Sequence, residues 1–342
     1  MKIVKVLEFG TGIAVAYAGY LLRDMGWDID RIILDEEDPL ISIPSRWGDR
    51  NNGLELFLNR GKSVSSDTAN ELQDRVAGVD IVIGDFSSHA LTELGIQTDF
   101  FEVITPRVGV ISITSFGLGH HLSEVSHSEL ILQAASGLLY LTGEAQQAPQ
   151  QLPPYSAEMC GGLTASTAAM ALARAYRLDG ELRRLDLSIV EAMSMHTFTQ
   201  SAAFIWRGEV TRREASVKEG LRVVPTSDGY VYCAPGATAS MDMKGIAKLI
   251  DEPRLTEERF QTAEGRKDNY DEFLALFIPP FREKTAAEWF TAADKLHLTF
   301  SLVRTVDELF SCEQLETRDI WTELDSGAKI PTRAFSAYPM FG

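Results

Sequence analysis

The chain is poor in cysteine and in basic residues. Its 342 residues contain three cysteines, Cys160, Cys233 and Cys312. Because they are odd in number and widely spaced, they support neither a disulfide framework nor a cysteine-based zinc site. Lysine and arginine total 32 against 49 acidic residues, which gives a net charge of -17. Nucleic-acid binding requires a basic surface, so we expect no nucleic-acid partner.

Long apolar runs are also missing. Hydrophobic residues make up 45% of the chain, which is ample for a globular core. No run reaches the length of a helix that spans a bilayer. The apolar N-terminus is interrupted by Glu8 and no cleavage site follows, so we interpret it as a strand, a glycine turn and a helix. We therefore expect a cytoplasmic protein with no membrane partner.

The motifs of several enzyme classes are absent. His120 and His121 are adjacent, and no His-Glu-x-x-His motif occurs, so we predict no metal site. No G-x-S-x-G hydrolase motif and no P-loop lysine motif are present either.

Strand-like and helical segments alternate in the first half of the chain. Residues 2–9, 28–34, 79–86 and 108–117 are rich in β-formers, and residues 68–77 are helical. This alternation predicts an α/β fold with a parallel sheet and a ligand at the carboxyl ends of its strands.

A change in composition predicts two domains. The segment "RGEVTRREASVKEG" that begins at residue 207 is charged, and a chain of this length normally exceeds one core. We predict a large Rossmann-like domain over residues 1–206, a smaller α+β domain over residues 207–297, and a return segment to the large domain over residues 298–342.

A glycine turn follows the first predicted strand. Gly10 and Gly12 fit the start of a dinucleotide-binding fingerprint, but Val15 stands at its third position. An NAD(P)-dependent oxidoreductase of Rossmann type is therefore kept only as an alternative.

One carboxylate stands directly before a small-residue helix. A proline-rich stretch over residues 143–154 leads to Glu158, and we expect a helix over residues 163–177. A carboxylate before a helix is held in its charged form by the helix dipole. Small residues let another segment or a ligand approach the helix closely; they are Gly161, Gly162, Ala165, Ser166, Ala168 and Ala169. From these residues alone, Glu158 is either a nucleophile or an ordinary acid at a helix start.

The order of several motifs resembles the class III CoA-transferases, the CaiB/BaiF family. The opening "VLEFG" to "LLRDMGWDI" is similar to the start of that family, and "LNRGKSV" to its N-x-x-K-x-S. The segments "SITSFG", "LQAASGLLYLTG" and "LDLSIVEA" are similar to later family motifs in the same order. The resemblance covers nearly the whole chain.

The resemblance implies a role for Glu158. "AEMCGG" stands where the family has A-D-x-x-x-G, with its nucleophilic aspartate. A carboxylate at this place attacks an acyl-CoA thioester and forms a mixed anhydride, and CoA then passes to an acceptor acid. The expected site excludes water and offers backbone amides to the oxyanion.

The resemblance also implies coenzyme A as substrate and predicts where it binds. By position, the expected contacts are Thr11, Gly12, Ile13, Ala14, Lys62, Ser66, Asp85, Phe86, Leu94, His127 and Glu129. The nearest cations for its phosphates are Arg46, Arg50, Arg60 and Lys62.

The resemblance leaves two alternatives within the family and implies a partner. The chain is a non-catalytic CoA-binding subunit, or an acyl-CoA racemase or lyase, if Glu158 is not the nucleophile. Related racemases have a His-Asp pair near the segment "SHSELILQ", where this chain has His127 and Glu129. We expect an interlocked homodimer, or a heteromer with a related subunit.

Overall fold

The chain forms two compact units. The computed structural model describes residues 4–10, 12–33, 40, 53–66, 69–97, 99–104, 108–123, 128–144, 147–213, 223–233, 242–324, 327 and 329–332. Contacts divide it into a first unit, Met1–Thr142 with Pro149–Val210 and Phe335–Gly342, and a second unit, Gly143–Ala148 with Thr211–Ala334. Each unit has a core of its own.

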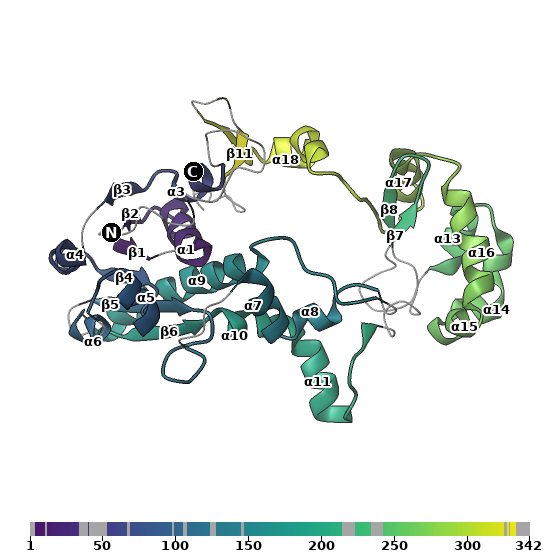
Figure 1. Cartoon of the computed structure of the whole chain (residues 1–342). Coiled ribbons are helices and arrows are strands. Elements are labelled where there is room, and N and C mark those ends of the chain that lie inside the picture. Colours follow the sequence, from purple (N-terminus) through teal and green to yellow (C-terminus); the bar gives the residue numbers. More distant parts are fainter. Residues whose placement is uncertain are drawn as a thin grey trace. The chain divides into compact units, whose positions relative to one another are not determined.

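A parallel six-stranded sheet forms the centre of the first unit (Figure 1). Its strands are β1 (Lys5–Phe9), β2 (Asp28–Ile33), β3 (Ser63–Ser66), β4 (Ile81–Gly84), β5 (Gly109–Thr114) and β6 (Arg184–Ser188). The order β3-β2-β1-β4-β5-β6 is that of dinucleotide-binding Rossmann folds. The predicted α/β fold with a Rossmann-like large domain is thereby confirmed.

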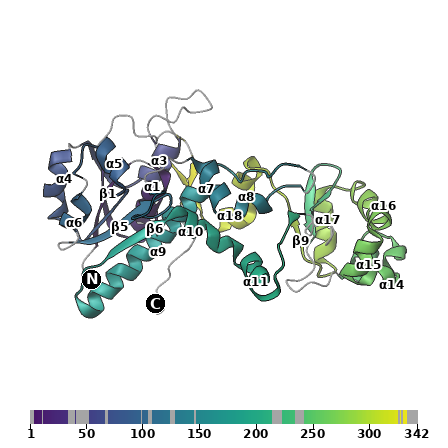
Figure 2. The same ribbon diagram turned by 60° about the horizontal axis from the view of Figure 1, so that its bottom comes forward.

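Helices cover both faces of this sheet. The helices of the first unit are α1 (Ile13–Asp24), α3 (Gly53–Asn59), α4 (Ala69–Val76), α5 (Ser88–Glu93), α6 (Phe100–Ile104), α7 (Glu129–Ala135), α8 (Leu138–Leu141), α9 (Ser156–Asp179), α10 (Ile189–Ser194) and α11 (Phe198–Arg207), with a 3-10 turn at Met195–Thr197. Helices α1 and α9 pack on one face, and α4, α5 and α6 on the other (Figure 2).

The alternation of side chains along the central strands explains these layers. In β1, Val6 faces the core under α1 and α9, whereas Leu7 and Phe9 face the core under α4 to α6. All residues of β4 and β5 are buried, as expected for central parallel strands with helices on both faces.

The second unit packs helices on a small antiparallel sheet. Its strands are β7 (Val223–Pro225), β8 (Tyr230–Cys233) and β9 (Phe300–Leu302), with a separate hairpin of β10 (Trp321–Glu323) and β11 (Lys329–Pro331). Its helices are α13 (Met243–Leu249), α14 (Glu258–Gln261), α15 (Ala263–Asp268), α16 (Tyr270–Phe281), α17 (Ala286–Asp294) and α18 (Glu313–Thr317), with 3-10 turns at Pro253–Thr256 and Asp307–Ser311.

Aromatic side chains form the core of the second unit. Phe273, Phe277 and Phe281 lie one turn apart on α16, with successive ring centroids 5.0 and 5.3 Å apart. The indole nitrogen of Trp289 donates to the carbonyl of Phe281 at 2.8 Å. Phe300 of β9 packs into the same cluster.

Two elements differ from the sequence-based expectations. Strand β9 pairs with β8 in the second unit, and contacts assign the chain to the first unit again from residue 335, whereas we expected the return to the large domain to begin at residue 298. Burial of Phe300 among the aromatic rings explains this pairing. Helix α9 begins at Ser156, not at residue 163, so Glu158 lies inside its first turn. Among the described residues, no helix combines the length and apolarity needed to cross a bilayer.

Candidate active site

The Glu158 carboxylate lies at the start of another helix. Its Oε2 atom accepts hydrogen bonds from the backbone N–H of Ile13 at 2.7 Å and of Ala14 at 3.3 Å. These two amides open α1, where backbone donors have no partner within the helix. The half-buried carboxylate therefore occupies an anion site made by the N-terminus of α1.

Small residues on α9 bring this carboxylate to α1. Gly162 lies one turn beyond Glu158, on the same face of α9. A Cβ atom added at Gly162 would lie 2.6 Å from the carbonyl oxygen of Ala14 and 3.0 Å from Cβ of Tyr17. Ala165 and Ala169 continue this face and are buried. The predicted close approach to this small-residue run is confirmed: the approaching segment is α1, which lies beside α9 in Figures 1 and 2.

A second carboxylate holds the start of α9. Glu129 of α7 accepts from the backbone N–H of Ala157 at 2.8 Å and of Glu158 at 3.3 Å. Gln133, one turn further along α7, donates to Glu129 at 2.7 Å and accepts from the N–H of Leu152 at 2.8 Å. This network fixes both the first turn of α9 and the segment that leads into it.

The network explains why α9 begins earlier than the sequence indicated. Tyr155, directly before the helix, has a left-handed backbone with a φ of 67°. Glu129 then supplies the acceptor that the first N–H groups of α9 require. A partner 29 residues away in the sequence is not visible from local helix signals.

The candidate site lies where the strand order reverses. β1 is hydrogen-bonded to β2 on one side and to β4 on the other, and ligands of open α/β sheets bind outside the carboxyl ends of such strands. Gly10 follows β1, and a Cβ atom there would lie 3.4 Å from the backbone nitrogen of Asp85, which follows β4. Gly12 adopts a φ of 117°, which favours glycine, and sets the direction of α1.

The structure brings only part of the predicted CoA contacts to this place. Ile13, Ala14 and Glu129 contact Glu158 or its helix, as described above. The carboxylate of Asp85 accepts from the N–H of Ser87 at 2.9 Å. Ser66 is exposed at the end of β3, two strands away from β1.

The remaining predicted contacts are apolar or lie elsewhere. Phe86 is 4% exposed and packs against Phe9, so its side chain belongs to the core. Leu94 is half-buried beside the same core. Thr11 and His127 lie outside the described residues.

The predicted phosphate-binding cations hold carboxylates of the protein instead. The Lys62 ammonium is fully buried and donates to Glu8 at 2.7 Å and to the carbonyl of Ala16 at 2.8 Å. Arg31 pairs with the same glutamate. The side chain of Arg60 pairs with Asp24 at 3.3 Å. A buried lysine offers no charge to a ligand, so Lys62 is better explained as a tether of α1; Arg46 and Arg50 lie outside the described residues.

A cysteine near Glu158 does not compete as a nucleophile. Cys160 is half-buried, with its sulfur 4.0 Å from Nδ1 of His196. Burial raises the pKa of the Cys160 thiol. Because the thiolate is the reactive form, a thiol with a raised pKa is a poor acyl acceptor at neutral pH.

Sequence comparison decides the family. The model of "CoA-transferase family III" matches residues 1–342, the whole chain. The chain belongs to CoA-transferase family III. It is therefore an enzyme of the CoA-transferase class, with CoA thioesters and carboxylic acids as its substrates, and the oxidoreductase alternative is excluded.

Curated relatives of this CoA-transferase carry names of the same activity. It is 24% identical to the succinate–glutarate CoA-transferase of Agrobacterium fabrum, over 96% of this chain and 86% of the relative. It is 23% identical to the mouse succinyl-CoA:glutarate CoA-transferase, over 91% of this chain and 74% of the relative.

Solved structures have the same fold. A CaiB/BaiF family protein from Brucella suis has a TM-score of 0.86 at 22% identity, covering 98% of this chain and 91% of that one. A Mycobacterium tuberculosis protein has a TM-score of 0.80 at 19% identity, covering 99% and 92%.

Proposed function

We propose that this enzyme moves CoA from an acyl-CoA donor to a carboxylic acid through covalent intermediates on Glu158. The observation that carries the proposal is the hydrogen bonding of Oε2 to the amides of Ile13 and Ala14. They hold the side chain in place and favour its anionic, nucleophilic form.

The reaction proceeds by four carbonyl attacks. Oε1 of Glu158 attacks the thioester carbonyl and the C–S bond breaks. CoA leaves as thiolate, and a mixed anhydride between Glu158 and the donor acyl group remains. The thiolate attacks the glutamyl carbonyl carbon, which releases the donor acid and leaves a glutamyl-CoA thioester. The acceptor carboxylate attacks the glutamyl carbonyl of this thioester, releases CoA thiolate and forms a second mixed anhydride between Glu158 and the acceptor. The thiolate then attacks the acceptor's carbonyl, which yields the new acyl-CoA and regenerates Glu158.

The same two amides act in the second and third steps. When a nucleophile attacks the glutamyl carbonyl, negative charge develops on Oε2. The N–H groups of Ile13 and Ala14 already donate to that atom, so they stabilise the oxyanion without rearrangement. One oxyanion donor contributes about 10²–10³ in kcat in well-studied enzymes.

Mass spectrometry with hydroxylamine tests this proposal. The protein is incubated with acyl-CoAs, starting with succinyl-CoA because it appears in the name of the mouse relative. Hydroxylamine converts a glutamyl anhydride or thioester to a hydroxamate. We expect this mass shift at Glu158, its loss in Glu158→Gln, and its retention in Glu191→Gln. Glu191 is a matched control because it is an exposed acid in the first turn of α10.

A negative result is equally informative. If CoA binds in calorimetry and no acyl-CoA of the panel labels Glu158, the nucleophile is wrong. The transfer of CoA then does not pass through a covalent intermediate on Glu158.

An exposed apolar helix supports the proposed partner. On α11, Phe198, Ile205 and Trp206 are 69%, 74% and 84% exposed. Several exposed apolar side chains on one helix are typical of a protein interface. A second copy of this chain, as a homodimer, is the occupant we propose for it.

A further inference from the structure

Three charged side chains lie buried between the sheet and α1. Glu8 of β1 and Arg31 of β2 stand opposite each other in the strand register and form an ion pair. Lys62, which directly precedes β3, donates to the second carboxylate oxygen of Glu8 at 2.7 Å. The side chains of Glu8 and Lys62 are fully buried, and that of Arg31 is 1% exposed. Because burial of charges costs free energy and a buried ion pair adds little net stability, stability alone does not explain this network.

The network contacts α1 within a single turn of that helix. Nζ of Lys62 also donates to the carbonyl oxygen of Ala16 at 2.8 Å. Gly19 lies against the Glu8 carboxylate, since a Cβ atom there would overlap Oε2 of Glu8 and lie 3.0 Å from Nζ of Lys62. Both oxygens of this carboxylate are held by cations, so it is not free to swing aside. The backbone of α1 therefore rests on the network from Ala16 to Gly19.

This contact lies close to the amides that hold Glu158. Ala16 follows Ile13 by three residues and Ala14 by two, and a helical turn has 3.6 residues. A displacement of the helix at Ala16 therefore reaches both amides. The distance of 2.7 Å from the nitrogen of Ile13 to Oε2 leaves little tolerance, because hydrogen bonds weaken steeply as their geometry departs from the optimum.

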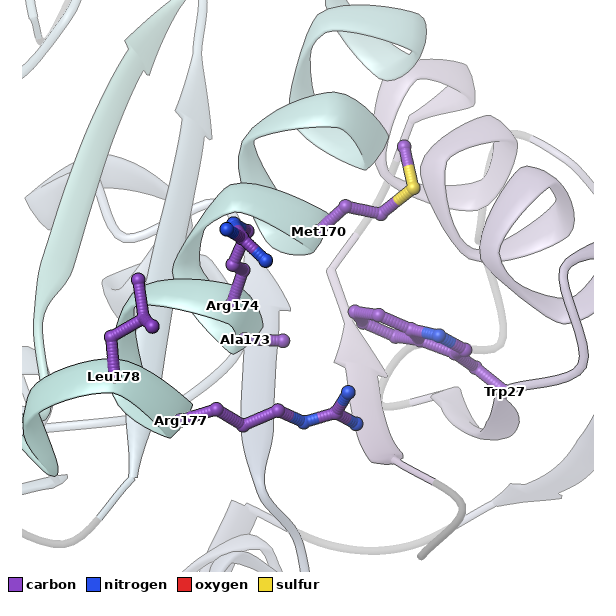
Figure 3. Close-up of a pocket in the computed structure, with 6 residues that line it drawn as sticks. All are labelled: Trp27, Met170, Ala173, Arg174, Arg177 and Leu178. Carbon is purple, nitrogen blue, oxygen red and sulfur yellow. The ribbon is translucent and has the colours of Figure 1, made fainter. Parts of the chain in front are cut away.

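The apolar contacts of α1 define its position along its axis less sharply. Small buried side chains of both helices share one core: Ala14 and Ala18 of α1, and Ala165 and Ala169 of α9. Small side chains form only shallow ridges between packed helices. Beyond the C-terminus of α1, the Trp27 ring faces α9 beside a hollow of about 260 Å³ (Figure 3). The directional hydrogen bonds of the buried network, in contrast, specify one position.

We propose that Glu8 and Lys62 are positioning residues for the reaction at Glu158. They fix α1 at the place along its axis where the amides of Ile13 and Ala14 meet Oε2. Buried polar groups that specify register at a cost in stability are best attested in coiled coils. An effect on the reaction rate rests on the function proposed for Glu158, whereas the position of the two amides is independent of it.

NMR of the Ile13 amide measures this position in the full chain without CoA. The chain carries ¹⁵N-isoleucine, and Ile13→Val identifies the Ile13 signal by its loss. A short hydrogen bond to a charged carboxylate moves an amide proton downfield, so Glu158→Gln defines the position of the signal without a charged acceptor. We expect Lys62→Met to move the Ile13 signal toward that position. Glu8 keeps its ion pair with Arg31 in this variant.

Gly19→Ala tests the same contact from the side of the helix. The new Cβ displaces the Glu8 carboxylate or lifts α1, so the Ile13 signal is expected to move here too. Gly53→Ala is the matched glycine control, because no atom of the described residues lies within 4 Å of its added Cβ. Arg266→Met is the control for loss of a buried cation, since Arg266 is 4% exposed and lies in the second unit. Both controls are expected to leave the Ile13 signal in place.

Hydroxylamine trapping at Glu158 measures the effect on the reaction. We expect labelling to be about 10-fold or more slower in Lys62→Met and Gly19→Ala than in the natural chain, and unchanged in the two controls. A natural chain without label contradicts the function proposed for Glu158, and the Ile13 signal then still decides the position of α1.

Circular dichroism shows which variants fold, and Gly19→Ala decides if Lys62→Met does not. The positioning role is overturned if the Ile13 signal stays in place in the folded variants, or if Arg266→Met moves it equally. It is also overturned if these variants are labelled at Glu158 as fast as the natural chain.

Discussion

Oε2 of Glu158 lies 2.7 Å from the backbone nitrogen of Ile13, across 145 residues of sequence. The carboxylate of one helix thus caps the N-terminus of another. Glu129 of α7 caps a helix in the same way, because it accepts hydrogen bonds at the N-terminus of α9, the helix that carries Glu158. Two successive helix starts are held by carboxylates, and the second of these carboxylates is the proposed nucleophile.

Shortening the side chain tests the reach of Glu158. Glu158→Asp removes one methylene and withdraws the carboxylate from the amides of Ile13 and Ala14. We expect kcat to fall about 10²-fold, because displacement of about 1 Å has that effect on a positioned group. Steady-state kinetics and the hydroxylamine assay measure it. An aspartate variant as fast as the natural chain would show that the reach of Glu158 does not matter.

We expect loss of the α9 cap to affect catalysis more than CoA binding. Glu129→Gln replaces an acceptor of two N–H groups by a side chain that also carries donors. We expect a stability loss of about 1–2 kcal/mol and a lower kcat with KM little changed. Thermal unfolding and kinetics are compared with Glu102→Gln, an exposed acid that pairs with Arg184. A change in KM alone would instead assign Glu129 to substrate binding.

Substitution of two neighbouring glycines of α9 distinguishes an effect on packing from an effect on catalysis. In Gly162→Ala the new Cβ meets the backbone oxygen of Ala14 at 2.6 Å, so the first turn of α1 has to move. In Gly161→Ala the Cβ meets a side-chain atom of Ile189 at 2.8 Å, and that side chain is able to shift. We expect each variant to lose about 1–3 kcal/mol of stability, measured by urea unfolding. Only Gly162→Ala is expected to lower kcat, about 10-fold or more. If the two variants had equal kcat values, the contact of Gly162 with Ala14 would not affect the reaction.

We expect two carboxylates to make the second unit less stable in acid. Thr285 and Glu288 form a capping box at α17, and the backbone N–H of Thr285 holds the pKa of Glu288 below its ordinary 4.5. The N–H of Ala286 likewise lowers the pKa of Asp228 below 3.8. Because both pKa values are lower in the folded state, this stabilisation is present above pH 4.5 and is lost as the pH falls through the folded values.

Calorimetry over an acid pH series measures this loss. Asp228→Asn and Glu288→Gln are expected to flatten the acid side of the stability curve, and Thr285→Ala to lower stability by about 1 kcal/mol at neutral pH. Glu283→Gln, an exposed acid of the same segment, is the control. If stability at acid pH fell equally steeply in Asp228→Asn and Glu288→Gln, these carboxylates would not be the cause of the acid sensitivity.

The apolar face of α11 is expected to hold the dimer. Ile205→Glu places a charge among exposed apolar side chains and opposes association. We expect the natural chain to sediment as a dimer and Ile205→Glu to shift toward monomer by 10-fold or more in the dissociation constant. Val306→Glu, with 75% exposure in the second unit, is the matched control. A natural chain that is monomeric in analytical ultracentrifugation would refute the proposed homodimer.

Several features were accessible from the sequence because they depend on local order. The strand-like segments, the glycine turn after the first strand and the alternation with helices fix a parallel α/β sheet, since parallel strands require crossover helices. The motif order gave the family, and the small residues around Gly162 indicated a close approach to α9.

Only the tertiary structure decided which groups meet. Arg60 and Lys62 looked available for phosphates, but Asp24 and Glu8 approach them from other elements and neutralise them. The start of α9 depends on Glu129, and the anchor of Glu158 depends on the free amides of α1. Local sequence determines which segments become helices and strands, because it sets their periodicity and their breaks. The partners of a charged side chain are set by long-range packing, which brings together residues that no sequence spacing relates.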